Sequence, residues 1–255
     1  MSNTSKADYR TGPLPAGVIG RTALGLVSRS LPQALPVWAA LAAVNAATQA
    51  ITLSAPEPAA GALPLTGPEL AGGAAGAVLI AAGIRIMLGA QRVWSVDAGL
   101  MVYFLFNLAT TSLQVGWAWL AAQAMTTQKE NPTGFLQVGL PLVVTGALML
   151  WANFRLGLWP LAKLIGHPGL TLASAWKRMA GGFWGWLVAT LALVWIPYYL
   201  ILTLFLGGLL KLHDRSPGAL AADALLGVAV TPTIVMTAAI MAAVYHLRAG
   251  EPPLG

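Results

Sequence analysis

Long apolar stretches follow one another along almost the whole chain, and short polar segments separate them. A helix of about 20 predominantly apolar residues is enough to cross the hydrocarbon core of a bilayer. Turn-forming residues mark the breaks, as in Asn131-Pro132 and Ser216-Pro217-Gly218. The pattern predicts about six transmembrane helices, with spans at about 33–54, 70–90, 98–122, 135–157, 183–209 and 219–247.

The second stretch is the least regular of the six, because it is rich in glycine and alanine and carries Arg85 near its end. Bundles of five or seven spans therefore remain open. Within this stretch Gly72 and Gly76 form a GxxxG pair, a spacing that allows membrane helices to approach closely. We expect an all-α fold, a polytopic membrane helix bundle that forms one domain over 33–247, with tails at 1–32 and 248–255.

Two shorter segments are amphipathic rather than spanning, and we predict that both lie in the membrane interface with their cations at the headgroups. The first, 17–30, mixes Arg21 and Arg29 with apolar residues. In the second, 170–182, the apolar residues share one helical face and the cations lie on the other. The apolar face comprises Leu172, Trp176, Met179 and Phe183. The opposite face comprises Ser174, Lys177, Arg178 and Gly181.

The residues at either end of the second segment predict its limits. Thr171 is placed to cap the helix through its hydroxyl group. Gly181-Gly182 is the expected bend, after which Phe183-Trp184 begins the fifth span.

Composition supports the membrane assignment. Of the 255 residues, 57% are hydrophobic and only 9% are charged, whereas a soluble domain carries about 25% charged residues. Such a chain cannot cover a water-facing surface of its own size.

The sequence has no cysteine, which excludes disulfides, thiolate metal sites and cysteine nucleophiles. We expect the first span to be a retained helix, although Leu53-Ser54-Ala55 leaves a cleaved signal peptide as an alternative.

Basic residues are distributed unequally between the two sides of the predicted bundle. With the N-terminus in the cytoplasm, eleven of them fall on the cytoplasmic side, a clear positive-inside bias. An even number of spans keeps both termini there, so we predict a bacterial inner-membrane protein with both ends cytoplasmic. The eleven are Lys6, Arg10, Arg21, Arg29, Arg85, Arg92, Arg155, Lys163, Lys177, Arg178 and Arg248. The opposite side receives Lys129, Lys211 and Arg215.

The net charge of +6 is scattered and contains no run of five or more basic residues, so nucleic acid is not an expected partner. Anionic lipid headgroups are the expected partner of these cations. Trp94 and three further tryptophans stand near the predicted cytoplasmic edges, where indole rings anchor helices. The predicted lipid-contacting set is Arg21, Arg29, Arg155, Trp159, Trp176, Lys177, Arg178 and Trp184.

Motifs for catalysis or metal binding are missing from the sequence. His167, His213 and His246 are far apart, and there is no HExxH spacing, carboxylate pair, phosphate loop or nucleophile elbow. Asp97 and Asp223 stand at predicted helix starts, where a carboxylate complements the helix dipole. We therefore expect no catalytic residue, no metal site, no cofactor and no enzymatic activity. An intramembrane enzyme is the hypothesis that these residues favour least.

Polar side chains inside the predicted spans are the remaining functional candidates, because lipid makes them costly unless they face protein or water. They can line a hydrated path for a substrate or protons. Alternatively, the amides form interhelical hydrogen bonds and the arginines reach the membrane surface. We favour the second interpretation, because no acidic residue lies securely at mid-membrane. The pairs that share a helical face are Asn45 with Gln49, Arg85 with Arg92, and Asn107 with Gln114.

One block of the sequence resembles a known family. In "RLGLWPLAKLIGHPGLTLASAWKRMAGGFWGWL" (155–187), an arginine ends a helix, and a Trp-basic-basic segment, a glycine and Phe-Trp lead into the next. This pattern is similar to a family of bacterial six-helix inner-membrane proteins. The family includes the membrane domain fused to some glycerophosphodiester phosphodiesterases and stand-alone relatives of the YciC type. "RTALGLVSRSLPQALPVW" (21–38) and "AAVYHLRAG" (242–250) resemble its N-terminal surface helix and its closing helix end.

The resemblance implies a fold and a location, but it brings no catalytic residue, because the phosphodiesterase is a separate soluble module. We expect a non-enzymatic, membrane-organising or partner-binding component whose basic cytoplasmic face contacts anionic lipid. The expected protein partner is a second copy or another membrane protein. The alternative is a small transporter or channel with a polar path lined by Asn107, Gln114 and Arg85.

Overall fold

The computed structural model describes residues 12–54, 67–127, 134–167, 169–209 and 217–249, which form helices and no strand within these ranges. Six of the helical segments are long and apolar enough to cross a membrane, and the predicted all-α fold class is confirmed. The elements are α1 (Ala16–Ser54), α2 (Gly67–Met87), α3 (Ala98–Thr127), α4 (Gly134–Leu164), α5 (Leu172–Arg178), α6 (Phe183–Thr190), the π-helical turn η1 (Leu191–Trp195), α7 (Ile196–Leu209) and α8 (Pro217–Ala249).

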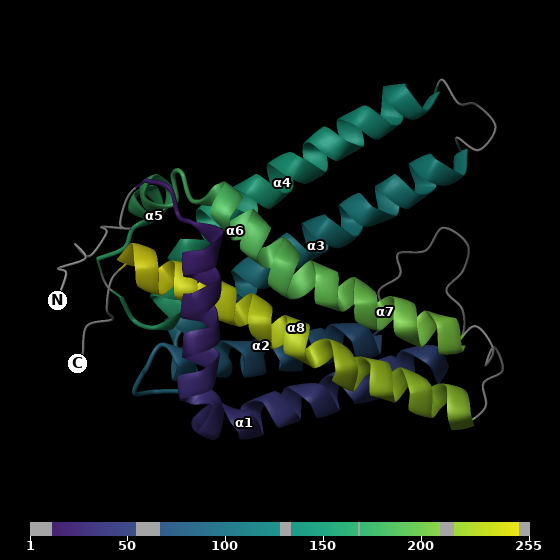
Figure 1. Cartoon of the computed structure of the whole chain (residues 1–255), viewed down its shortest axis with the longest axis horizontal. Helices are drawn as coiled ribbons and strands as arrows, with labels where there is room; N and C mark the ends of the chain where they lie inside the picture. The colour runs from purple at the N-terminus through teal and green to yellow at the C-terminus, as the bar shows by residue number, and fades with distance from the viewer. Residues whose placement is uncertain (1–11, 55–66, 128–133, 168, 210–216, 250–255) are drawn as a thin grey trace.

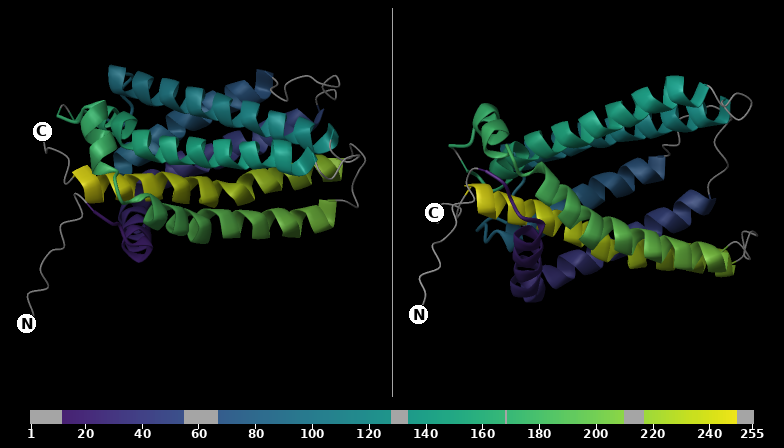
Figure 2. Two further views of the ribbon diagram at one scale, coloured as in Figure 1. Left: turned by 90° about the horizontal axis from the view of Figure 1, so that it is seen from above. Right: turned by 45° about the horizontal axis from the view of Figure 1, so that its top comes forward.

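The helices form two groups that meet at one end of the molecule. The second part of α1 runs beside α2 and α8, whereas α3 packs chiefly on α4. Away from α5, the α3–α4 pair diverges from the other helices (Figures 1 and 2). We call the end at which α1 begins, α8 ends and α5 lies the basic end. Every Lys and Arg in the described part of the chain belongs to segments at this end: Arg21, Arg29, Arg85, Arg92, Arg155, Lys163, Lys177, Arg178 and Arg248.

α1 is one bent helix. Its first part crosses the bundle and its second part runs along it (Figure 1). Pro32 and Pro36 lie inside α1, and a proline removes one helical hydrogen bond and clashes with the carbonyl four residues earlier. The predicted segment 17–30 and the first predicted span are therefore continuous in the backbone and differ in direction.

The fifth predicted span, 183–209, is also continuous but irregular. α6 passes into α7 through the π-helical turn η1, and Pro197 is the second residue after this turn. A π-helical turn holds one extra residue, which relieves the clash between a proline ring and the preceding turn. The irregularity thus has a local cause in the sequence.

Several predicted limits differ from the structure. α2 ends at Met87 rather than at 90, and α3 continues to Thr127 rather than ending at 122. α4 continues to Leu164, beyond the predicted limit at 157, because Leu158, Leu161 and Leu164 are buried in the core. α5 covers only Leu172–Arg178 of the predicted 170–182, because the chain turns after Met179 and Gly181 adopts a φ of 75°. The capping prediction is confirmed, since the Thr171 hydroxyl accepts a hydrogen bond from the Ser174 amide at 3.2 Å.

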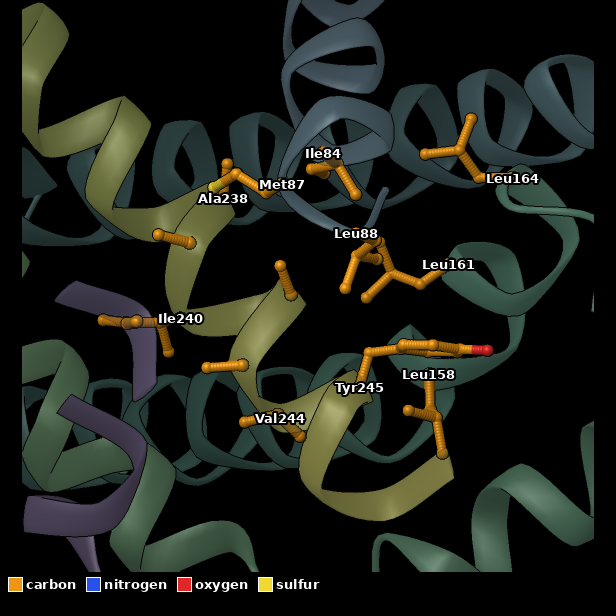
Figure 3. Close-up of a cluster of buried hydrophobic side chains, with 14 of the residues drawn as sticks. Ile84, Met87, Leu88, Leu158, Leu161, Leu164, Ala238, Ile240, Val244 and Tyr245 are labelled. Carbon is orange, nitrogen blue, oxygen red and sulfur yellow. The ribbon is translucent and has the colours of Figure 1, made fainter. Parts of the chain in front are cut away.

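The apolar core lies toward the basic end and contains buried side chains of α1, α2, α4 and α8, and Figure 3 shows its part between α2, α4 and α8. Toward the opposite end, α3 and α4 expose most of their leucines and valines. The labelled core residues are Ile84, Met87, Leu88, Leu158, Leu161, Leu164, Ala238, Ile240, Val244 and Tyr245. The basic end is therefore the well-packed part of the molecule, and the opposite end of the α3–α4 pair is not.

Close helix contacts depend on glycine. A Cβ atom added to Gly72 would overlap the Thr48 side chain on α1. A Cβ atom added to Gly76 would lie 3.6 Å from a methyl carbon of Leu41, also on α1. The close approach predicted for the GxxxG pair is thus confirmed at Gly72, with α1 as the neighbour, whereas a Cβ atom at Gly76 would make an ordinary contact.

Candidate functional site

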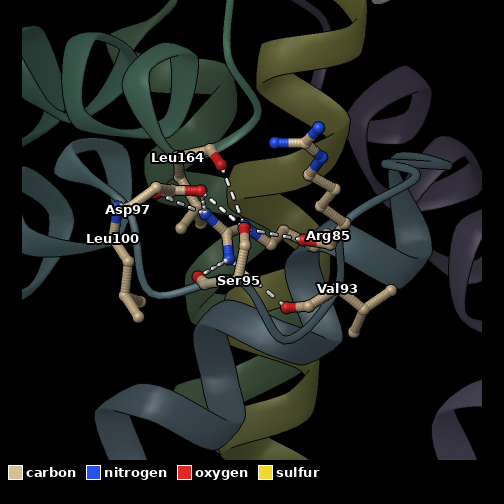
Figure 4. Close-up of polar contacts among 7 residues, drawn as sticks. Arg85, Val93, Ser95, Asp97, Leu100 and Leu164 are labelled. Atoms are coloured by element: carbon tan, nitrogen blue, oxygen red, sulfur yellow. Dashed lines mark hydrogen bonds and ion pairs between the residues drawn. The ribbon is translucent and has the colours of Figure 1, made fainter.

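Arg85, at the end of α2, is buried at 2% exposure and fully hydrogen-bonded (Figure 4). Its Nε donates to the Leu164 carbonyl at 2.9 Å. Nη1 donates to the carbonyls of Val93 and Ser95 at 3.3 and 2.7 Å. Nη2 donates to both carboxylate oxygens of Asp97, at 2.8 and 2.7 Å. All five N–H donors of the guanidinium are used. The prediction that Arg85 reaches the membrane surface is therefore wrong, and the side chain instead joins α2 to the end of α4 and the start of α3.

Asp97 also caps α3. Its Oδ1 accepts a hydrogen bond from the Leu100 amide at 2.8 Å, and its Oδ2 accepts one from the Ser95 hydroxyl at 2.6 Å. Partial burial alone raises the pKa of Asp97, but these two hydrogen bonds and the Arg85 guanidinium outweigh it, and the pKa lies below its ordinary value. The predicted role at the helix start is confirmed. The ion pair with Arg85 was not predicted.

Arg155 lies between two tryptophans. Its guanidinium carbon is 4.7 Å from the ring centroid of Trp176 on α5 and 5.3 Å from that of Trp151 on α4. The two rings meet edge to face at 5.1 Å. No carboxylate among the described residues pairs with this cation, so aromatic faces hold it in place and leave its charge unneutralised.

The other predicted lipid-contacting residues lie in different settings. Arg21 and Arg29 are exposed on the first part of α1, and Lys177 is exposed on α5. Trp184 is 73% exposed, whereas Trp159 is half-buried. The four exposed side chains are accessible to lipid headgroups, whereas the half-buried Trp159 offers the least surface for such a contact.

Arg178 and Arg248 tie the end of α8 to the rest of the basic end. Nη1 of Arg178 donates to the Arg248 carbonyl at 3.3 Å. Arg248 is fully buried, and its Nη2 donates to the carbonyls of Gly12 and Ala180 at 2.6 and 3.1 Å. Arg178 therefore belongs partly to the protein interior, which its position on the helical wheel did not indicate.

The predicted polar residues of the spans do not form one group. Asn45 donates to the Thr231 hydroxyl at 3.0 Å, which confirms an interhelical hydrogen bond between α1 and α8. Asn107 donates within its own helix, to the Tyr103 carbonyl at 2.8 Å. Gln49 and Gln114 are exposed. Arg92 is exposed beyond α2, and Arg85 is used by the network of Asp97.

Two adjoining cavities lie between the two groups of helices. One, of about 360 Å³, is lined by residues of α1, α2, α3 and α8 and includes both Asn45 and Asn107. The other, of about 330 Å³, lies between α2, α3, α4, α6 and α8 and includes Asn107 and Asn153. Both cavities include Ile80, Tyr103, Asn107 and Ile234. Asn153 was not among the predicted site residues. The sequence does contain a signal for it, because an asparagine within the fourth apolar span is a polar residue in a predicted membrane helix.

Comparisons with known proteins give no match to a family model, to a curated protein or to a solved structure. The resemblance to the YciC-type family therefore stays a prediction.

Within the described ranges, no three His, Asp or Glu side chains come together where they could hold a metal ion.

Proposed function

We propose that this chain is a non-enzymatic, multi-pass protein of the bacterial inner membrane, with its basic end in the cytoplasm bound to anionic lipid headgroups. In this role it organises the membrane locally or holds a membrane partner there. The supporting observation is the position of the cations, since every described Lys and Arg belongs to a segment at the basic end. Positive charge on one side is typical of the cytoplasmic face.

The first part of α1 supports a contact with the membrane surface. It crosses the direction of the long helices, as a helix lying in an interface would (Figure 2). Its inward side is apolar, with Ile19 and Ala23 buried against the bundle. Arg21 and Arg29 remain exposed, and a cation near an anionic bilayer surface contributes about 1 kcal/mol of binding.

Arg155 supplies the most specific lipid contact. A guanidinium without a carboxylate partner is free to form a bidentate pair with a phosphate group. Trp151 and Trp176 fix its plane, so the side chain loses little freedom when an anion binds. We assign a lipid phosphate to this position.

The transporter alternative has less support. Its path was expected to include Arg85 and Gln114, but the five donors of Arg85 are used within the protein, and Gln114 lines neither cavity. Of the three expected residues, Asn107 alone lines either of the two cavities described above, so we do not propose this function.

The proposed function predicts lipid selectivity. In reconstituted membranes, electron paramagnetic resonance of spin-labelled lipids should show that the full chain associates more with phosphatidylglycerol than with phosphatidylcholine, and that salt weakens this preference. Changing Arg29, Arg155 and Lys177 together to Gln should reduce the preference to less than about half.

A matched control removes the same charge from the other predicted side, by changing Lys129, Lys211 and Arg215 to Gln. This variant should keep most of the preference. Equal losses in the two triple variants, or a preference that does not change with salt, would contradict the proposal.

A further inference from the structure

The cavity of about 330 Å³ has the character of a small-ligand site. Its volume lies within the range of about 300–1,000 Å³ in which small ligands bind. Most of its wall is apolar, and a small number of polar groups interrupt this wall. The apolar residues include Ile80 and Ile84 of α2, Phe106 of α3, Leu161 of α4, and Ile234 and Met241 of α8. Such a wall accommodates a hydrocarbon body.

Asn153 supplies an unmet polar group in this wall. It lies on α4, half-buried, and no other described residue provides a hydrogen-bond partner for its carboxamide. Inside a bilayer no bulk water is present to satisfy such a group, and an unpaired carboxamide is costly there. The arrangement therefore calls for a partner that the protein itself does not supply.

Further polar side chains line the same cavity, among them Tyr103, Asn107 and Thr237. Asn107 on α3 donates one amide hydrogen to the Tyr103 backbone carbonyl and also hydrogen-bonds the Tyr103 side chain, which leaves part of the hydrogen-bonding capacity of its carboxamide for a ligand. The Thr237 hydroxyl on α8 donates to the Thr233 carbonyl at 2.8 Å and can still accept a hydrogen bond. Together these groups offer both donors and acceptors, which suits a hydroxyl or carbonyl group on the ligand.

The cavity carries no charge. Neither Asp, Glu, Lys, Arg nor His is among its lining residues. Arg85 follows the lining residue Ile84 directly, but Asp97 and backbone carbonyls already use its donors. An ionised group would therefore enter a low-dielectric site without a counter-charge, which is strongly unfavourable.

We infer that this cavity binds an uncharged lipid, with its hydrocarbon chain along the apolar wall and one hydroxyl or carbonyl group hydrogen-bonded to Asn153 and Asn107. Neutral membrane lipids with a free alcohol or an ester carbonyl have this chemistry. The inference is independent of the headgroup contact proposed above, because Trp151, Arg155 and Trp176 do not line this cavity and the two ligands differ in charge.

The test uses the full chain in nanodiscs and a pair of photoactivatable probes. One is hexadecanol bearing a diazirine on its chain, and the other is the phosphate ester of the same alcohol. The alcohol should label the protein saturably, and mass spectrometry should place the crosslinks on α3, α4 and α8 at the cavity. The phosphate should label these positions at least about tenfold less.

Variants separate the cavity from the outer surface. Asn153→Leu should weaken labelling by the alcohol about tenfold, as expected for the loss of one hydrogen bond in a mostly apolar cavity. Thr237→Phe should block the cavity by filling it, and Thr237 is not a core residue, so this variant tests the site even where Asn153→Leu does not fold. Gln114→Leu removes an amide from an exposed position on α3 and should leave labelling unchanged.

Several results would overturn the inference. They are equal labelling by alcohol and phosphate, crosslinks confined to the exposed leucines of α3 and α4, and full labelling of a folded Thr237→Phe variant. The absence of saturable labelling would mean that water alone fills the cavity.

Discussion

The interactions of Arg85 show how a buried cation becomes part of the fold. A guanidinium in an apolar environment is tolerated only when its charge is paired and its donors are satisfied. Asp97 supplies the charge, and three backbone carbonyls supply the remaining acceptors. This network connects α2, α3 and α4 at the basic end, where the two groups of helices meet (Figure 4).

Removal of the carboxylate should destabilise the bundle. Asp97→Asn leaves the Arg85 guanidinium buried without its counter-charge, and we expect a loss on the order of 1–3 kcal/mol, limited by the 44% exposure of Asp97. Thermal unfolding in detergent at neutral pH measures this loss. Asp223→Asn is the matched control, because Asp223 forms no ion pair within the described ranges.

The same pair predicts a pH dependence. The pKa of Asp97 is lower in the folded than in the unfolded protein, so its contribution is complete above the ordinary aspartate pKa of about 3.9 and is lost as the pH falls through the lower, folded value. The difference in melting temperature between the parent chain and Asp97→Asn should therefore shrink on acidification from pH 7 toward pH 3. A difference that stays constant over this interval would exclude the ion pair as its cause.

At the scale of the elements, glycine and proline decide how the helices meet. The prolines of α1 allow its two parts to run in different directions, and Pro197 accounts for the irregular turn between α6 and α7. Gly227 brings α8 against the backbone of α1, where an added Cβ atom would lie 2.7 Å from the Asn45 carbonyl oxygen. The hydrogen bond between Asn45 and Thr231 depends on this close approach.

Gly227→Ala should separate α1 from α8. Backbone atoms on both sides cannot move out of the way cheaply, so we expect a destabilisation of about 1–3 kcal/mol. Gly116→Ala in α3 is the control, because no atom lies within 4 Å of its added Cβ, and alanine is the better helix former. Thermal unfolding should give a lower midpoint for the first variant and an unchanged or higher one for the second. The reverse order would contradict the close contact.

At the scale of the whole molecule, the orientation in the membrane is the main prediction. The chain has no cysteine, so single cysteines can be introduced without a background signal. Lys177→Cys at the basic end should react with a membrane-impermeant maleimide only after the cells are permeabilised. Ser216→Cys, between the fifth and sixth predicted spans, should react in intact cells. Labelling of Lys177→Cys in intact cells would reverse the proposed topology.

The apolar spacing of the sequence determined the all-α class and the approximate helix limits, because length, turn residues and side-chain polarity act locally along the chain. The cap at Thr171 and the helix start at Asp97 are equally local and were predicted. The pairing of Arg85 with Asp97, the two tryptophans around Arg155, and the cavity that joins Asn107 to Asn153 were decided by the tertiary structure alone. Each of these depends on which faces of different helices meet, and a helical repeat specifies a face but not its neighbour.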